Sequence, residues 1–186
     1  LCSKSADGVK IVDTKDREIY TRDNQQLVSL NQDGPIPGHY MQVDGRDVRT
    51  NAMSTNQRTY FKTHTVMEFD ETGAPHQVVM LENKHDEKVV AINKDADNVI
   101  AKVRHITSIS IPLSRPPSSY NTLEEVKGEH PEVLFYKVPR EVGSVYFYFK
   151  SYLKDKQRIL GFDDNGNALD PTQVQPGQEQ SLFQMM

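Results

Sequence analysis

Histidines and acidic residues are the side chains in this sequence that could hold a metal ion or move a proton. The six histidines are scattered, and no two of them stand two or four positions apart, as ligands on one strand or helix would. His85, Asp86 and Glu87 offer three ligand types in a row, but a solvated polar turn explains them better. We therefore expect no metal site and no cofactor.

The sequence also lacks the short motifs of well-known catalytic sites. It contains no glycine-rich phosphate loop, no H-E-x-x-H signature and no G-x-S-x-G turn. Its one cysteine, Cys2, stands near the start of the chain without a fixed partner, so it is a poor candidate for a nucleophile. We expect that the protein is not an enzyme and has no catalytic residues.

Two polar runs resemble the start of a calcium-binding loop. In the run that begins at Asn93, the sixth position should be glycine and is Asn98, and the twelfth should be glutamate and is Arg104. The run that begins at Asp163 fails at the same two positions. Both runs are therefore interpreted as hairpin turns.

The composition limits the compartment and the partners. The 186 residues suit one domain, the net charge is −4, and no run of five basic residues suggests binding to nucleic acid. The mean hydropathy is −0.66, and no segment approaches the ~18 apolar residues that predict a membrane helix, so no membrane insertion is expected. A single cysteine excludes an internal disulfide and is typical of folding in a reducing compartment. We also expect no secretory signal peptide, since no basic-then-apolar run opens the sequence.

The elements that would position any site are short strands. Apolar runs of four to ten residues, rich in β-branched and aromatic types, alternate with turns of Asp, Asn, Gly and Pro, which predicts an all-β class. Only residues 120–128 look helical, with Thr122 as a possible N-cap and Glu125 three residues later.

An internal repeat refines this class. Residues 89–100 and 159–170 share one pattern at an offset of 70 residues, with two or three apolar residues, a polar turn and an apolar pair. A third copy is expected in 18–30, with its turn at Asp23, Asn24 and Gln25. Three such hairpins predict a single β-trefoil domain over residues 1–186, in which six strands close a barrel and three hairpins cap it. Unrelated hairpins in a β-sandwich remain the alternative.

The spacing leaves two polar segments unexplained, at about 31–61 and 114–131, and we interpret both as long loop inserts. Eleven apolar residues are expected in the core: Val90, Ile92, Val99, Leu134, Phe147, Phe149, Leu160, Phe162, Leu169, Leu182 and Phe183. The absence of tryptophan argues against the sugar-binding trefoils, and the acidic last turn argues against the heparin-binding ones.

The order of short motifs resembles that of the interleukin-1 cytokine family. Residues 9–35 are similar to its opening strand, turn and hairpin, 76–103 to its second hairpin, and 132–170 to its "F-x-F-x-K/R … F-E-S" block; "QPGQEQSLFQMM" resembles its last strand. Two departures stand out, because Lys150 replaces the usual glutamate and "KDKQR" at 154–158 replaces the usual Pro-Gly/Asn-Trp turn.

The resemblance implies an extracellular receptor ligand, a monomer made without a signal peptide from a possible cytoplasmic precursor. Its partners would be an immunoglobulin-domain receptor and an accessory receptor chain, and it would trigger or block inflammatory signalling. The expected receptor contacts follow from the matched motifs and from the proline-rich insert: Asp13, Lys15, Arg17, Arg115, Tyr120, Gln178 and Glu179.

Two other kinds of protein stay open at this point. A trefoil protease inhibitor could project residues 114–119 as a rigid loop into an active site. An intracellular trefoil that binds another protein would have no receptor activity.

Overall fold

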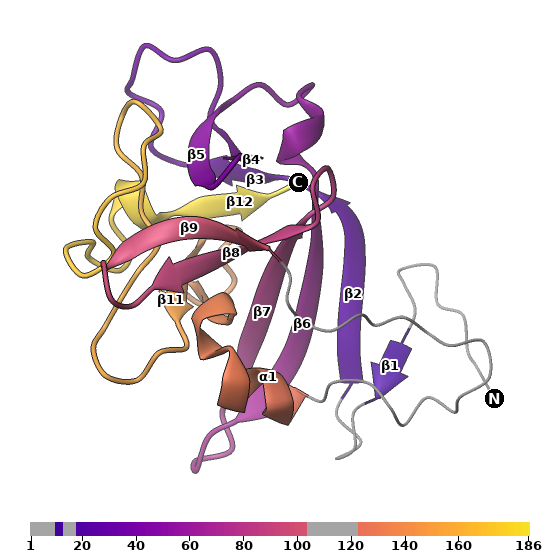
Figure 1. Cartoon of the computed structure of the whole chain (residues 1–186). Coiled ribbons are helices and arrows are strands. Elements are labelled where there is room, and N and C mark those ends of the chain that lie inside the picture. Colours follow the sequence, from indigo (N-terminus) through magenta and orange to yellow (C-terminus); the bar gives the residue numbers. More distant parts are fainter. Residues whose placement is uncertain (1–9, 13–17, 104–122) are drawn as a thin grey trace, which may run out of the picture.

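The computed structural model describes residues 10–12, 18–103 and 123–186. Within them the chain forms one antiparallel sheet of twelve strands, which curls on itself and confirms the all-β class (Figure 1). The strands are β1 (Lys10–Val12), β2 (Glu18–Gln25), β3 (Leu27–Ser29), β4 (Tyr40–Asp44), β5 (Asp47–Ala52), β6 (Phe61–Phe69), β7 (Pro75–Asn83), β8 (Lys88–Asn93), β9 (Asn98–Val103), β10 (Phe135–Pro139), β11 (Phe147–Ser151) and β12 (Phe183–Met185).

Helix is a minor component of the described residues. The one α-helix, α1, spans Leu123–Glu129 and confirms the expected helix over 123–128; Thr122, the expected N-cap, lies outside the described residues. Short 3-10 helices follow at Gln57–Thr59, Pro131–Val133 and Glu179–Ser181. No helix among the described residues combines the length and the apolar character that crossing a membrane would require.

The pairing of strands returns to the segment on which it began. The path runs from β2 through β6, β7, β10, β11 and β12 to β3, and only Gln26 separates β3 from β2. At that residue the ends of the path meet, because Gln26 N–H donates to Met186 O (3.1 Å) and Met186 N–H donates to Gln26 O (2.8 Å). The segment 18–29 therefore pairs with β6 through its first part and with β12 through its last part.

The prediction of a hairpin in 18–30 is wrong. β2 and β3 do not pair with each other, and the register of β2 against β6 shifts between Arg22 and Gln25 instead of reversing. Asn24 has a φ of +55°, which asparagine tolerates better than most residues, so the polar run forms a β-bulge rather than a turn.

The hairpin of this part of the chain lies in 31–61, which is therefore more than a loop insert. β4 and β5 pair as an antiparallel hairpin joined by Gly45 and Arg46, and Gly45 has a φ of +65° that suits glycine. The sequence did not reveal these strands because both are largely polar. Of the other expected insert, residues 114–122 lie outside the described residues and 123–131 include α1.

The two hairpins found from the internal repeat are confirmed. β8 pairs with β9 over six residues, and the pair Asn93 and Asn98 closes the turn. In the later copy, Phe162 bridges Ala168, and Asp163 N–H donates to Asn167 O at 2.9 Å.

The main core lies inside the curl. Ten of the eleven residues expected in the core are buried, although Leu134 belongs to the second cluster described below; Leu169 is half-buried. Phe149, fully buried, is packed by three rings whose centroids lie 5.2 to 6.2 Å away: Phe135, Phe147 and Phe183. A second apolar cluster covers the outer face of the sheet, where Val126 of α1 packs against residues that include Val66 and Val78. β7 is consequently buried on both faces over its second half.

Replacing Phe149 with alanine should remove the aromatic centre of the core. We expect a loss of about 3–5 kcal/mol in the free energy of unfolding, from lost burial and from the cavity left behind. Urea denaturation measures it, with Phe69→Ala as control, because Phe69 is 69% exposed and should cost about 0.5 kcal/mol. Equal losses in both variants would contradict the packing described here.

Candidate functional site

Most of the expected receptor-contact residues lie outside the described part of the chain. The structure places Gln178 and Glu179, both with exposed side chains, in the loop before β12. It thus leaves untested whether the expected residues come together. The five outside the described residues are Asp13, Lys15, Arg17, Arg115 and Tyr120.

The loop that carries Gln178 and Glu179 has a fixed backbone. Ser181, which is fully buried, accepts from Gly177 N–H at 3.1 Å and donates its hydroxyl to Gln178 O at 2.8 Å. The 3-10 helix Glu179–Ser181 adds a bond from Ser181 N–H to Gln178 O at 2.8 Å. The side chains of Gln178 and Glu179 are therefore exposed on a turn whose backbone is fixed by hydrogen bonds. A partner could bind such a turn at little cost in conformational entropy.

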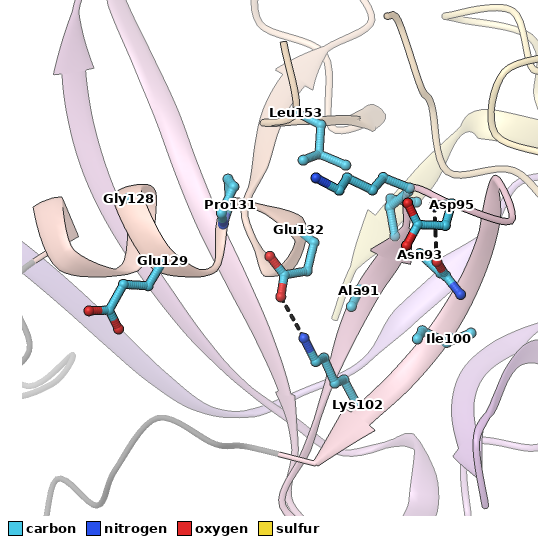
Figure 2. A pocket seen from close by; sticks show the side chains of 12 residues that line it. Ala91, Asn93, Asp95, Ile100, Lys102, Gly128, Glu129, Pro131, Glu132 and Leu153 are labelled. Atoms are coloured by element: carbon cyan, nitrogen blue, oxygen red, sulfur yellow. Dashed lines mark hydrogen bonds and ion pairs between the residues drawn. The ribbon is translucent and has the colours of Figure 1, made fainter. Parts of the chain in front are cut away.

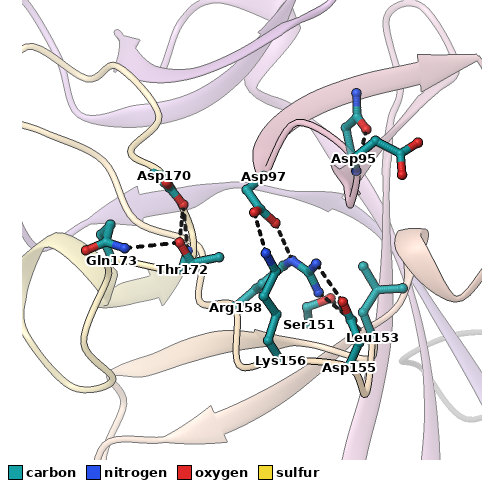
Figure 3. Close-up of polar contacts among 11 residues, drawn as sticks. Asp95, Asp97, Ser151, Leu153, Asp155, Lys156, Arg158, Asp170, Thr172 and Gln173 are labelled. Carbon is teal, nitrogen blue, oxygen red and sulfur yellow. Dashed lines mark hydrogen bonds and ion pairs between the residues drawn. The ribbon is translucent and has the colours of Figure 1, made fainter.

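A buried arginine ties two loops together (Figure 3). The side chain of Arg158 has no exposed surface; its Nε lies 2.9 Å from Asp97, and Nη1 and Nη2 lie 2.7 and 3.0 Å from the two oxygens of Asp155. Asp97 belongs to the β8–β9 turn, whereas Asp155 lies in the segment after β11. This bidentate contact falls in 154–158, where the sequence departs from the interleukin-1 pattern.

The carboxylates around Arg158 are held in their charged form. Hydrogen bonds from Lys156 and Arg158 lower the pKa of Asp97, and the hydrogen bond from Arg158 lowers the pKa of Asp155 to about 2. Asp155 in turn raises the pKa of Arg158. Because these charges satisfy one another, we interpret the cluster as a structural tie between loops rather than as a ligand site.

A pocket of about 500 Å³ lies between the β8–β9 hairpin and the segment that contains α1 and the next 3-10 helix (Figure 2). Within it Lys102 Nζ contacts Glu132 Oε1 at 2.6 Å. Burial alone would raise the pKa of Glu132, but the hydrogen bond from Lys102 helps to lower it overall. Both charges are thus paired, and the remaining lining mixes Lys94 with Asp95 and Glu129, so the pocket has no preference for one sign of charge.

A second pocket, of about 380 Å³, lies at the end of the sheet where β7 begins and β10 ends. We call it the polar pocket and define it by its two cations and three amides, Arg22, Gln25, Gln77, Lys137 and Gln184. Burial and the nearby charge of Arg22 lower the pKa of Lys137, and its Nζ stands 4.4 Å from the centre of the Phe147 ring. Sequence reasoning missed this site, because its residues come from four strands up to 162 positions apart.

The described residues show no constellation that suggests metal chemistry. Across 10–12, 18–103 and 123–186, no three His, Cys, Asp or Glu side chains converge as ligands would. His85 and Asp86 belong instead to the turn between β7 and β8, where Asn83 Oδ1 accepts from His85 N–H at 3.0 Å.

No protein-family model matches the chain, and no curated protein sequence matches it. The resemblance to the interleukin-1 family therefore depends on the order of its motifs alone.

The ion pairs of Arg158 should make the stability depend on pH. Asp155 has a pKa of about 2 in the folded protein and 3.8 as a free side chain, so the unfolded chain binds more protons between these values and stability falls as the pH drops through them. We expect the stability difference between the wild type and Arg158→Met to be largest above about pH 4 and to shrink towards about pH 2.

Urea denaturation at stepped pH measures this difference. Arg49→Met serves as control, since Arg49 is exposed and lies 3.4 Å from the exposed Asp47. A difference between wild type and Arg158→Met that stays constant across this range would contradict a stabilising role for the ion pairs.

Proposed function

We propose that the chain is a β-trefoil domain that binds a cell-surface receptor in the manner of interleukin-1-like cytokines. The observation that carries the fold is the order of pairing: β2–β3, β6, β7, β10, β11 and β12 follow one another in a ring, with Gln26 and Met186 bonded across its seam. Along the chain, three hairpins each lie between two strands of this ring. β4–β5 lies between β3 and β6, β8–β9 lies between β7 and β10, and the hairpin of residues 159–169 lies between β11 and β12. A trefoil requires such a threefold alternation, so this order of pairing supports the proposal.

The receptor-binding part of the proposal combines this plan with the motif order. In the interleukin-1-like sequences that the chain resembles, a similar opening strand, central hairpin and closing strand occur in the same succession. The loop before β12 supports it, because Gln178 and Glu179 are exposed side chains on a backbone fixed by Ser181. Exposed polar groups on a rigid loop can act as anchors in an otherwise weak protein interface.

On this proposal the protein acts outside the cell as a monomer. It engages an immunoglobulin-domain receptor first and an accessory receptor chain second, and the outcome is activation or blockade of inflammatory signalling. Recognition would be protein to protein, without a cofactor.

A crystal structure of the full chain tests the trefoil. We expect the three units, which begin at β2, β7 and β11, to superpose on one another after rotations of about 120° around a single axis. A sheet whose first and last strands lie apart, or three hairpins at unrelated angles, would reject the trefoil while leaving the all-β class intact.

Surface plasmon resonance against a panel of interleukin-1-family receptor ectodomains tests the function. We expect saturable binding to one ectodomain and weakening by about tenfold in Glu179→Lys, because a reversed charge meets the partner's complementary surface. Glu71→Lys is the matched control, since Glu71 is an exposed residue of the β6–β7 turn and its reversal changes the net charge equally. A folded protein that binds none of the ectodomains would overturn the receptor proposal.

A further inference from the structure

We propose that the polar pocket binds a tetrahedral oxyanion, a phosphate group in the first instance, between Arg22 and Lys137. Both side chains line the same cavity of about 380 Å³, and the described residues provide neither of them with a carboxylate partner. The site is separate from the loop that carries Gln178 and Glu179, and it does not depend on the receptor proposal.

Strand alternation places the pocket directly beyond the core. On β10 the fully buried Phe135 faces the core, so Lys137, two residues later, points to the same side. On β7 the buried Val79 faces the core, and Gln77, two residues earlier, lies beside Lys137 because these two residues are paired across the strands. The inward faces of two neighbouring strands thus change from apolar to polar at the same level of the sheet.

The bulge in β2 adds the second cation. In a regular strand, residues three apart point to opposite faces, yet Arg22 and Gln25 line the same pocket. The register shifts between these two residues and Asn24 has a positive φ, so the strand contains one extra residue here and the usual alternation of faces is interrupted. Bulges commonly change the direction of a side chain in this way. The bulge in β2, which stands where a hairpin turn was predicted, therefore also brings Arg22 opposite Lys137.

The two cations of the polar pocket have no carboxylate partner among the described residues. None of its lining residues is acidic, and Arg22 and Lys137 have no ion pair with any described residue. Lys137 is half-buried, and its one favourable electrostatic neighbour among the described residues is the ring of Phe147. Arg22 is exposed, but its positive charge adds to the cost of partly burying the Lys137 ammonium, and a bound anion would lower that cost.

The donors favour a doubly charged tetrahedral group over a carboxylate. A guanidinium offers a planar fork and an ammonium offers three further N–H groups, and the amides of Gln25, Gln77 and Gln184 can donate around them. A phosphate monoester carries a charge of about −1.5 to −2 at neutral pH and so neutralises both cations, whereas a carboxylate would neutralise the charge of only one of them. Such a group has enough oxygens to accept from both cations and an amide.

Isothermal titration calorimetry of the full chain at low ionic strength tests the proposal with inorganic phosphate and with phosphoserine as probes. We expect saturable binding, weakened by about tenfold or more in Lys137→Gln and in Arg22→Gln, because each loses one charge-assisted contact. Lys150→Gln and Arg46→Gln are the matched controls: both residues are exposed, lie outside the pocket and lose the same charge.

Two further readouts separate binding from a merely structural role. Lys137→Arg should keep phosphate affinity, since it retains the cation, although its contact with the Phe147 ring must change. In carbon-13-labelled lysine the pKa of Lys137 should rise when phosphate is added, because the anion stabilises the ammonium form. A lysine that only covers Phe147 would show neither phosphate binding nor this rise.

The two probes distinguish the source of the phosphate. Binding of inorganic phosphate alone would assign the pocket to the free ion, while binding of phosphoserine with the same dependence on Lys137 would assign it to a phosphate group carried by a larger molecule. No saturable binding of either probe, or equal weakening by all four glutamine variants, would overturn the proposal.

Discussion

The pairing of one continuous segment with two different strands is the constraint on which this structure depends. Residues 18–29 pair with β6 through their first part and with β12 through their last part, so the same segment begins and ends the path of hydrogen bonds. Backbone groups of Gln26 and Met186 that would otherwise line an open edge bond each other. The inward faces of the strands then enclose the cluster around Phe149.

Charge is distributed over this framework in two contrasting ways. Arg158 is fully buried but forms ion pairs with Asp97 and Asp155, and these pairs join two loops that are far apart in the sequence. Lys137 is half-buried and has no carboxylate partner among the described residues. A desolvated charge is costly unless an opposite charge lies beside it. Two carboxylates of the chain meet this need for Arg158, whereas for Lys137 we propose that a ligand does.

Sequence reasoning succeeded where local pattern and burial coincide. Both hairpins of the internal repeat, the helix Leu123–Glu129 and ten of the core residues follow from short apolar runs and turn residues. It failed in 18–61, where Asn24 forms a bulge instead of a turn and the polar strands β4 and β5 form the hairpin. There the pattern is ambiguous, because a polar run of Asp, Asn and Gln serves a bulge as well as a turn.

The sequence by itself determined the all-β class, the turns at Asn93–Asn98 and Asp163–Asn167, and ten of the buried apolar residues, because each depends on neighbours within a few positions. Only the tertiary structure decided which strand closes the sheet, that Arg158 is the buried partner of Asp97, and that Arg22 and Lys137 share one pocket. These three relations join Gln26 to Met186, Asp97 to Arg158 and Arg22 to Lys137, which stand 160, 61 and 115 positions apart. They are set by strand register and by the direction of each side chain, and neither quantity is encoded in a local pattern.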